Sequence, residues 1–159
     1  MRNPLRKFIA LGGALACLVG GLAVAQDKPA DNMDVLREKL RADKKAVVAE
    51  VLQLTEGEAK VFWPVYNAYQ SDMVTHYDRL LKLLDTYASS YETMTDAQAT
   101  SMLQQYLGLE RDHVAILTAY LPRFQKVLPP KKVAKLYQVE NKARALVNYE
   151  LARGIPLVK

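Results

Sequence analysis

Two histidines are the residues of this sequence best suited to chemistry. His76 and His113 both fall on apolar helical faces, with Asp72 four residues before the first and Glu110 three residues before the second. Two imidazoles and a carboxylate form a common ligand set for a transition metal, so these four side chains make a metal site one hypothesis. The competing interpretation is a pair of core histidines satisfied by tyrosine or carboxylate neighbours, and isolated histidines on an apolar face favour it.

Patterns for catalysis are incomplete in this sequence. Glu110 and His113 form one Glu-x-x-His unit of the kind found in di-iron bundles, but such a site needs a second unit and two further carboxylates. A Gly-x-Ser-x-Gly nucleophile elbow is absent, and Cys17 is the only cysteine. We therefore expect no enzyme activity and no cofactor.

The first 25 residues have the pattern of a secretory signal. Arg2, Arg6 and Lys7 form a basic start, an apolar stretch follows, and Ala23-Val24-Ala25 is a small-x-small cleavage site before Gln26. Cleavage after Ala25 would leave a periplasmic chain, residues 26–159, with no cysteine and no stable membrane span. The formal charge of +5 then falls to about +2 without those three basic residues, which is a weaker basic bias than nucleic-acid binders show.

Hydrophobic periodicity predicts that residues 26–159 form a single all-α domain of four helices. They are expected at about 33–52, 56–90, 96–127 and 130–152. Thr55 and Thr95 are the predicted caps of the second and third helices, and Glu58 can complete a capping box with Thr55. Pro130 suits the first turn of the fourth helix, and Gly154 is a plausible C-terminal cap.

The second and third helices carry apolar seams at alternating spacings of three and four residues. These seams predict a long antiparallel hairpin, flanked by the N- and C-terminal helices. Pro64 predicts a kink near residues 60–64, with a break in the helix as the alternative. If the hairpin turns near residue 92, His113 lies about one turn, roughly 6 Å along the axis, from the position opposite His76.

Two short motifs resemble those of a known family. Leu54-Thr55-Glu56-Gly57-Glu58 and Met94-Thr95-Asp96-Ala97-Gln98 are similar to the Leu-Thr-x-x-Gln motif of the Spy/CpxP family of small exported helical proteins. The resemblance implies a bent helical hairpin, pairing of two chains into a cradle-shaped homodimer, and action as an ATP-independent chaperone or envelope-stress protein. Related metal-resistance proteins of the family sense metals. Glu58 stands where the motif has Gln, and Leu128-Pro129-Pro130 departs further from it.

Aromatic and methionine side chains are the candidates for binding protein clients, because they combine apolar area with adaptable contacts. The residues chosen for a concave client-binding face are Tyr66, Tyr69, Met73, Tyr106 and Phe124. Glu140 interrupts the inner face of the fourth helix, and Arg144, four residues on, is its expected ion-pair partner. A polar contact to a partner protein is the functional alternative for Glu140.

Three functions remain open from the sequence. The first is an ATP-independent chaperone-like or envelope-stress protein that binds partly unfolded envelope proteins. The second is a periplasmic metal-binding or sensing module that uses His76 and His113. The third is a structural adaptor with one fixed protein partner, docking through the apolar tail from Ile155 to Val158.

Overall fold

The computed structural model describes residues 42–158, so the predicted signal at residues 1–25 and the first part of the predicted first helix lie outside the described residues. Within 42–158 the chain forms four helices and no strand, which confirms the predicted all-α fold. A short helix covers residues 42–52, and the others are α3 (Glu56–Ser90), α4 (Asp96–Gln125) and α5 (Pro130–Gly154).

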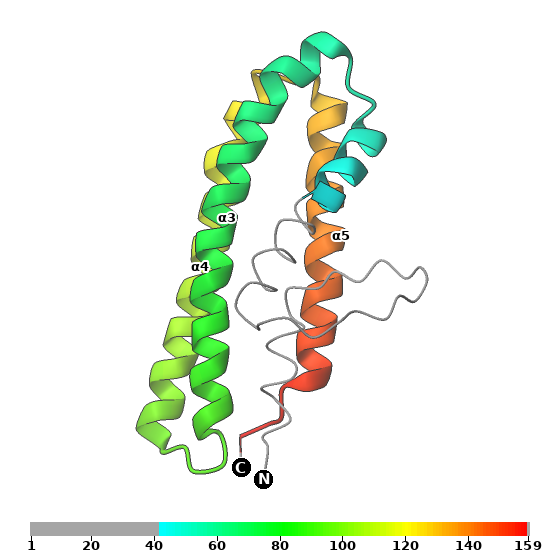
Figure 1. Cartoon of the computed structure of the whole chain (residues 1–159). Helices are drawn as coiled ribbons and strands as arrows, with labels where there is room; N and C mark the ends of the chain where they lie inside the picture. Colours follow the sequence, from blue (N-terminus) through cyan, green and yellow to red (C-terminus); the bar gives the residue numbers. More distant parts are fainter. Residues whose placement is uncertain (1–41, 159) are drawn as a thin grey trace, which may run out of the picture.

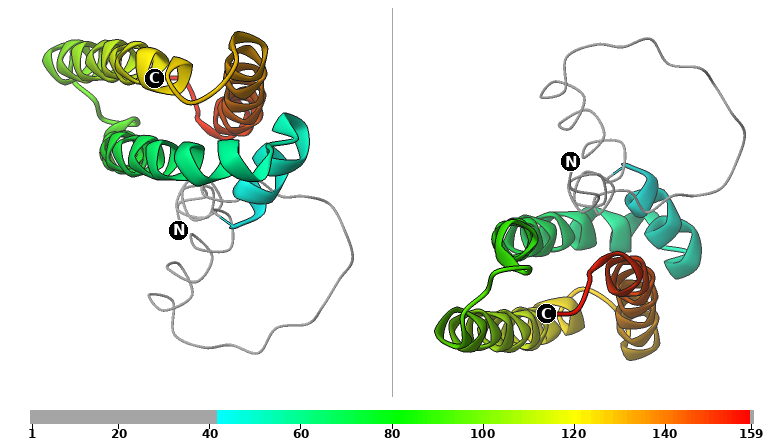
Figure 2. Two further views of the ribbon diagram at one scale, coloured as in Figure 1. Left: turned by 90° about the horizontal axis from the view of Figure 1, so that it is seen from above. Right: turned by 90° about the horizontal axis from the view of Figure 1, so that it is seen from below.

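The three long helices run alternately down, up and down (Figure 1). α3 and α4 pack side by side as the predicted antiparallel hairpin, and α5 returns from the far end of α4. Seen along the length of the molecule, α5 lies beside one end of the hairpin (Figure 2). No Cα atom of α5 lies within 8 Å of a Cα atom of α3, so these two helices meet only through long side chains.

Local sequence signals set where the helices begin. Thr55 and Thr95 each cap a helix through a complete capping box, with Glu58 and Gln98 as the returning side chains. The Thr55 N–H donates to Glu58 Oε2 at 2.8 Å, and the Thr95 N–H donates to Gln98 Oε1 at 2.9 Å. Both predicted caps are therefore confirmed. Each box satisfies two backbone donors that the first turn of a helix leaves free.

Prolines occur inside two helices without ending them. α3 continues through Pro64, so the alternative of a broken helix is wrong. Its first turns lean away from the line of its later turns in Figure 1, as expected where proline removes one backbone donor and crowds the preceding turn. α4 also continues through Pro122 but ends at Gln125, two residues before the predicted end. α5 extends to Gly154, two residues past its predicted end, and Ile155 is its C-cap.

The buried core lies towards one end of the molecule. It joins the first half of α3, the end of α4 and the start of α5, and its side chains are Val48, Leu52, Phe62, Tyr66, Tyr69, Met73, Tyr120, Phe124, Leu128, Val133 and Leu136. The 42–52 helix contributes two apolar side chains to this core, Val48 and Leu52. Later in α3 the seam residues Leu80, Leu83 and Tyr87 are only half-buried, so the hairpin is less tightly covered towards its tip.

Candidate functional site

The two histidines meet at the interface between α3 and α4. His76 and His113 have ring centroids 5.5 Å apart, and each side chain is about 95% buried. The Nδ1 atoms of both rings are buried and have no hydrogen-bond partner. The two histidines therefore lie next to each other, as predicted. Leaving a buried ring nitrogen without a hydrogen-bond partner costs free energy.

Burial and neighbouring cations keep both imidazoles neutral near pH 7. Burial, together with the charges of Arg144 and His76, lowers the pKa of His113 to about 4, against the opposing effect of Glu110. Burial also lowers the pKa of His76, with Arg79 as the next cause. Arg79 is paired with Asp112 at 2.7 Å across the hairpin, so cations and anions both border the two rings.

The carboxylates predicted to complete a metal site are engaged elsewhere. Asp72 Oδ2 accepts a hydrogen bond of 2.7 Å from the Tyr120 hydroxyl, and Glu110 Oε2 accepts one of 2.6 Å from Arg144. Among residues 42–158 no three His, Cys, Asp or Glu side chains gather closely enough to hold a metal ion. The structure therefore brings together two of the four proposed ligands, His76 and His113, and not Asp72 or Glu110 with them.

Glu140 of α5 is the centre of a polar network that sequence spacing did not reveal. Its carboxylate accepts hydrogen bonds from the Tyr66 hydroxyl at 2.9 Å and the Tyr69 hydroxyl at 3.4 Å. Gln70 Nε2 donates to it at 3.3 Å, and Lys44 Nζ donates at 2.7 Å from the 42–52 helix. Burial and the Glu140 charge raise the pKa of both tyrosines, which keeps their hydroxyls protonated as donors.

The expected pairing of Glu140 with Arg144 is wrong. Arg144 instead reaches from α5 to α4, where it pairs with Glu110 at 2.6 Å. Glu140 is only 9% exposed, and its negative charge is balanced by Lys44. The network therefore ties α5 to α3 and to the 42–52 helix at a place where the backbones of α3 and α5 do not touch.

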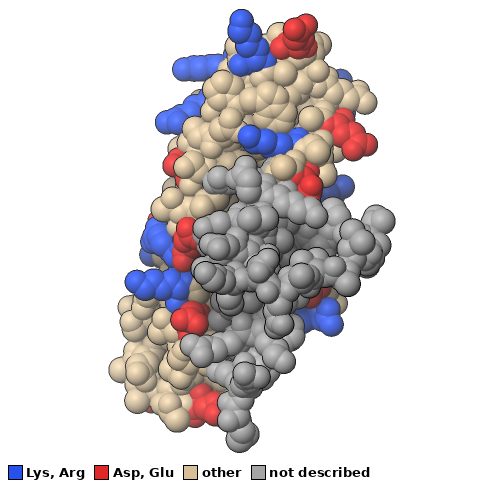
Figure 3. Space-filling view, in the orientation of Figure 1, with Lys and Arg blue, Asp and Glu red and all other residues tan. Residues whose placement is uncertain are grey.

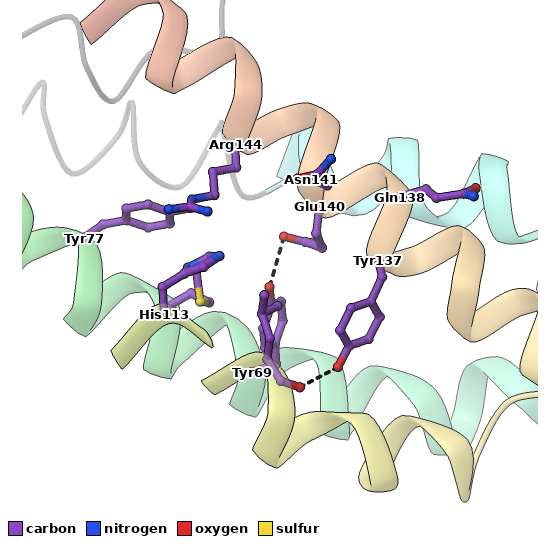
Figure 4. Close-up of a pocket in the computed structure, with 10 residues that line it drawn as sticks. Tyr69, Tyr77, His113, Tyr137, Gln138, Glu140, Asn141 and Arg144 are labelled. Carbon is purple, nitrogen blue, oxygen red and sulfur yellow. Dashed lines mark hydrogen bonds between the residues drawn. The ribbon is translucent and has the colours of Figure 1, made fainter. Parts of the chain in front are cut away.

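A pocket of about 340 Å³ lies beside this network (Figure 4). α3 contributes Tyr69, Met73 and Tyr77, and α4 contributes His113 and Leu117. The lining from α5 is mostly polar and consists of Tyr137, Gln138, Glu140, Asn141 and Arg144. In Figure 4, Tyr77, His113 and Arg144 gather at one end of the pocket, while Tyr69, Tyr137 and Glu140 lie towards the other. The pocket is thus apolar in its walls and charged at both ends.

Four of the five residues proposed to contact clients belong to the core. Tyr66, Tyr69, Met73 and Phe124 are at most 2% exposed, because the seams of α3 and α4 that carry them face each other and the start of α5. They are therefore not accessible as a binding face in this fold. Tyr106, on the part of α4 nearer the hairpin tip, is 44% exposed and is the only one of the five that is accessible.

An exposed row of apolar side chains runs along α4 next to Tyr106. We call Leu103, Leu107, Val114 and Leu121 the α4 stripe; each is between 38% and 58% exposed. Leu107, Val114 and Leu121 are seven residues apart, and Leu103 precedes Leu107 by four, so all four point to one side of the helix. This second periodic row was readable from the sequence, but the stronger inner seam concealed it.

The charged side chains on the surface do not indicate a particular class of binding partner. The face seen in Figure 3 carries basic and acidic side chains intermixed among the described residues. Within 42–158 no helix is both long enough and apolar enough to cross a bilayer.

A scan against protein-family models found no match, and searches of curated proteins and of solved structures returned no significant match.

Proposed function

We propose that this protein binds partly unfolded proteins through the α4 stripe, without ATP, as an exported chaperone-like protein. The observation that carries the proposal is the exposure of Leu103, Leu107, Val114 and Leu121 in one row. Contiguous apolar surface on a folded protein commonly marks a place where another molecule binds. The sequence pattern of residues 1–25 supports the exported location.

The dimensions of the α4 stripe suit a short segment of an unfolded chain. From Leu103 to Leu121 the helix advances by about 27 Å, at a rise of about 1.5 Å per residue. An extended segment of about eight residues covers the same length. Tyr106 borders the row and adds an amphipathic ring, which can pack against apolar side chains while its hydroxyl stays in water.

The surroundings of the α4 stripe favour the binding of many different clients over the binding of one. Among the neighbouring positions on α4, Gln104 and Thr118 are exposed and uncharged, and Arg111 is exposed and basic. Glu110 lies between Leu107 and Val114 and is paired with Arg144. The surroundings therefore impose no single sign of charge on a bound segment. The half-buried leucines of α3 near the hairpin tip, among them Leu80 and Leu83, extend the apolar character of this half of the molecule. Loose, weakly directional contacts of this kind are compatible with binding many sequences.

The test is light scattering of a denatured client diluted into buffer, with and without purified residues 26–159. Suppression of aggregation without ATP is expected. The double variant Leu103→Gln/Leu107→Gln should lose most of it. The control Leu146→Gln/Leu157→Gln changes two leucines outside the α4 stripe that are at least as exposed, and it should retain the suppression. Helicity measured by circular dichroism checks that both variants fold.

Two results would contradict the proposal. The first is no suppression at a several-fold excess of the protein, and the second is equal suppression by both double variants. A stable complex with one protein from the same compartment, in the absence of general suppression, would support the adaptor hypothesis instead.

A further inference from the structure

The pocket between the α3–α4 hairpin and α5 differs from the α4 stripe in its chemistry. Its volume of about 340 Å³ is at the lower end of the range for small-molecule sites. Its lining combines apolar walls with a few convergent polar groups, as ligand sites in folded proteins do. The charged groups at its two ends decide which kind of ligand it can accept.

The carboxylate of Glu140 has no hydrogen-bonding capacity left for a ligand. Its two oxygens offer about four acceptor positions, and Lys44, Tyr66, Tyr69 and Gln70 supply four donors. Its charge is already balanced by Lys44 at 2.7 Å. A cationic ligand would therefore compete with an existing, partly buried ion pair, which is costly to break.

The opposite end of the pocket has unused hydrogen-bond donors. Arg144 carries five N–H donors, and the hydrogen bond that the structure describes for it uses one nitrogen, Nη2, on Glu110. His113 lies at the same end, is 4% exposed and has a buried Nδ1 with no partner. A guanidinium beside an imidazole with unused hydrogen-bonding capacity suits an anionic group with several acceptor atoms.

The walls between these ends suit a flat apolar body. The Tyr69 hydroxyl donates to Glu140, and the Tyr137 hydroxyl donates to the Leu117 carbonyl at 2.6 Å, so both hydroxyl hydrogens are already used. Both hydrogen bonds are drawn in Figure 4. Tyr69 is enclosed in the core, whereas the half-buried side chains of Tyr77, Leu117 and Tyr137 offer faces and edges suited to aromatic or branched carbon atoms.

We propose that this pocket binds a small organic acid, with its carboxylate against Arg144 and His113 and its planar apolar body against the half-buried side chains of Tyr137 and Leu117. The volume accommodates a ligand of about ten to fifteen non-hydrogen atoms. The carboxylate accepts hydrogen bonds from the guanidinium and from one imidazole N–H. The site does not depend on the proposed function, because none of its residues belongs to the α4 stripe.

Three probes of the same shape and different charge test this proposal. Benzoate, benzamide and benzylamine are each titrated into the purified protein by isothermal calorimetry. Benzoate is expected to bind with a Kd in the millimolar range or below, and the two other compounds at least tenfold more weakly. Arg144→Gln should weaken benzoate binding at least tenfold. The control Arg153→Gln removes an exposed arginine of the same helix that pairs with Glu150, and it should leave the affinity unchanged.

A second measurement locates the bound probe and does not require a variant. Benzoate should shift the His113 imidazole signals in NMR spectra and raise the pKa of that ring, because an anion nearby favours its protonated form. The proposal is overturned if benzylamine binds as tightly as benzoate, or if Arg144→Gln has no effect on benzoate binding. It is also overturned if none of the three probes binds at concentrations up to about 10 mM. Aggregation suppression by the α4 stripe is measured separately, so either proposal can fail alone.

Discussion

Lowering the pH from 7 to 5 should destabilise this protein by about 2 kcal/mol through His113 alone. Burial lowers the pKa of this imidazole from its usual 6.5 to about 4, so the folded protein keeps the ring neutral while the unfolded chain protonates it. Between these two pKa values the unfolded state binds more protons. The free energy of unfolding therefore rises with pH across this window. The part of it that His113 contributes is lost progressively as the pH falls below about 6.5.

The magnitude follows from the size of the pKa shift. One pKa unit corresponds to about 1.4 kcal/mol, so the whole shift is worth about 3 kcal/mol by pH 4 and about 2 kcal/mol by pH 5. His76 should add a loss of the same sign, because its pKa is also lowered by burial. At lower pH Glu58 contributes as well, because the hydrogen bond from Lys132 lowers its pKa and its stabilisation is lost as it becomes protonated. The window from pH 7 to 5 therefore isolates the histidines best.

Urea unfolding followed by circular dichroism at a series of pH values measures this loss. The variant His113→Leu removes the titrating ring and should have a shallower pH dependence than the parent protein, whatever its stability at pH 7. A matched control is Asp85→Asn, which changes an exposed charge of α3 away from the histidine pair and should keep the parent slope. An unfolding free energy that stays constant from pH 7 to 5, or an unchanged slope in His113→Leu, would refute the reasoning.

Three further predictions concern stability. Glu140→Ala should lower the free energy of unfolding, measured by chemical denaturation, by about 3 kcal/mol, because it leaves Lys44 and two tyrosine hydroxyls without their partner. The control Glu150→Ala, at an exposed position, should change that free energy by under about 0.5 kcal/mol. Thr95→Ala should cost about 1 kcal/mol through the loss of the α4 cap, and Thr95→Ser should recover most of it; equal losses in both would contradict a capping role. Zinc added to metal-free protein should leave the melting temperature unchanged, and a rise abolished by His76→Ala would restore the metal hypothesis.

Features encoded by neighbouring residues were predicted correctly from the sequence. The start of α3 and the start of α4 depend on Thr55, Glu58, Thr95 and Gln98, which act within one turn. The hairpin follows from two apolar seams joined by a short turn, and its register brought His76 and His113 together as expected. Each of these inferences needs only helical periodicity and one short connection.

Features that depend on the position of α5 could not be predicted in the same way. Arg144 lies four residues from Glu140, so local spacing favoured their pairing, but their actual partners are on α4, on α3 and on the 42–52 helix. The client-binding residues were misplaced for a related reason. Tyr66, Tyr69 and Phe124 look amphipathic in sequence, but only the packing of three helices shows that they are enclosed.

The pocket exists because the same residues that join α5 to the hairpin also hold it away. Tyr66 and Tyr69 reach across from α3 with their full length and end on Glu140, so the carboxylate and two aromatic rings act as a spacer. A carboxylate at this position needs several donors, and an aliphatic residue would let α5 approach α3 more closely. Glu140→Leu should therefore shrink the pocket and abolish benzoate binding although Arg144 is retained. Unchanged binding in that variant would show that the aromatic rings alone set the spacing.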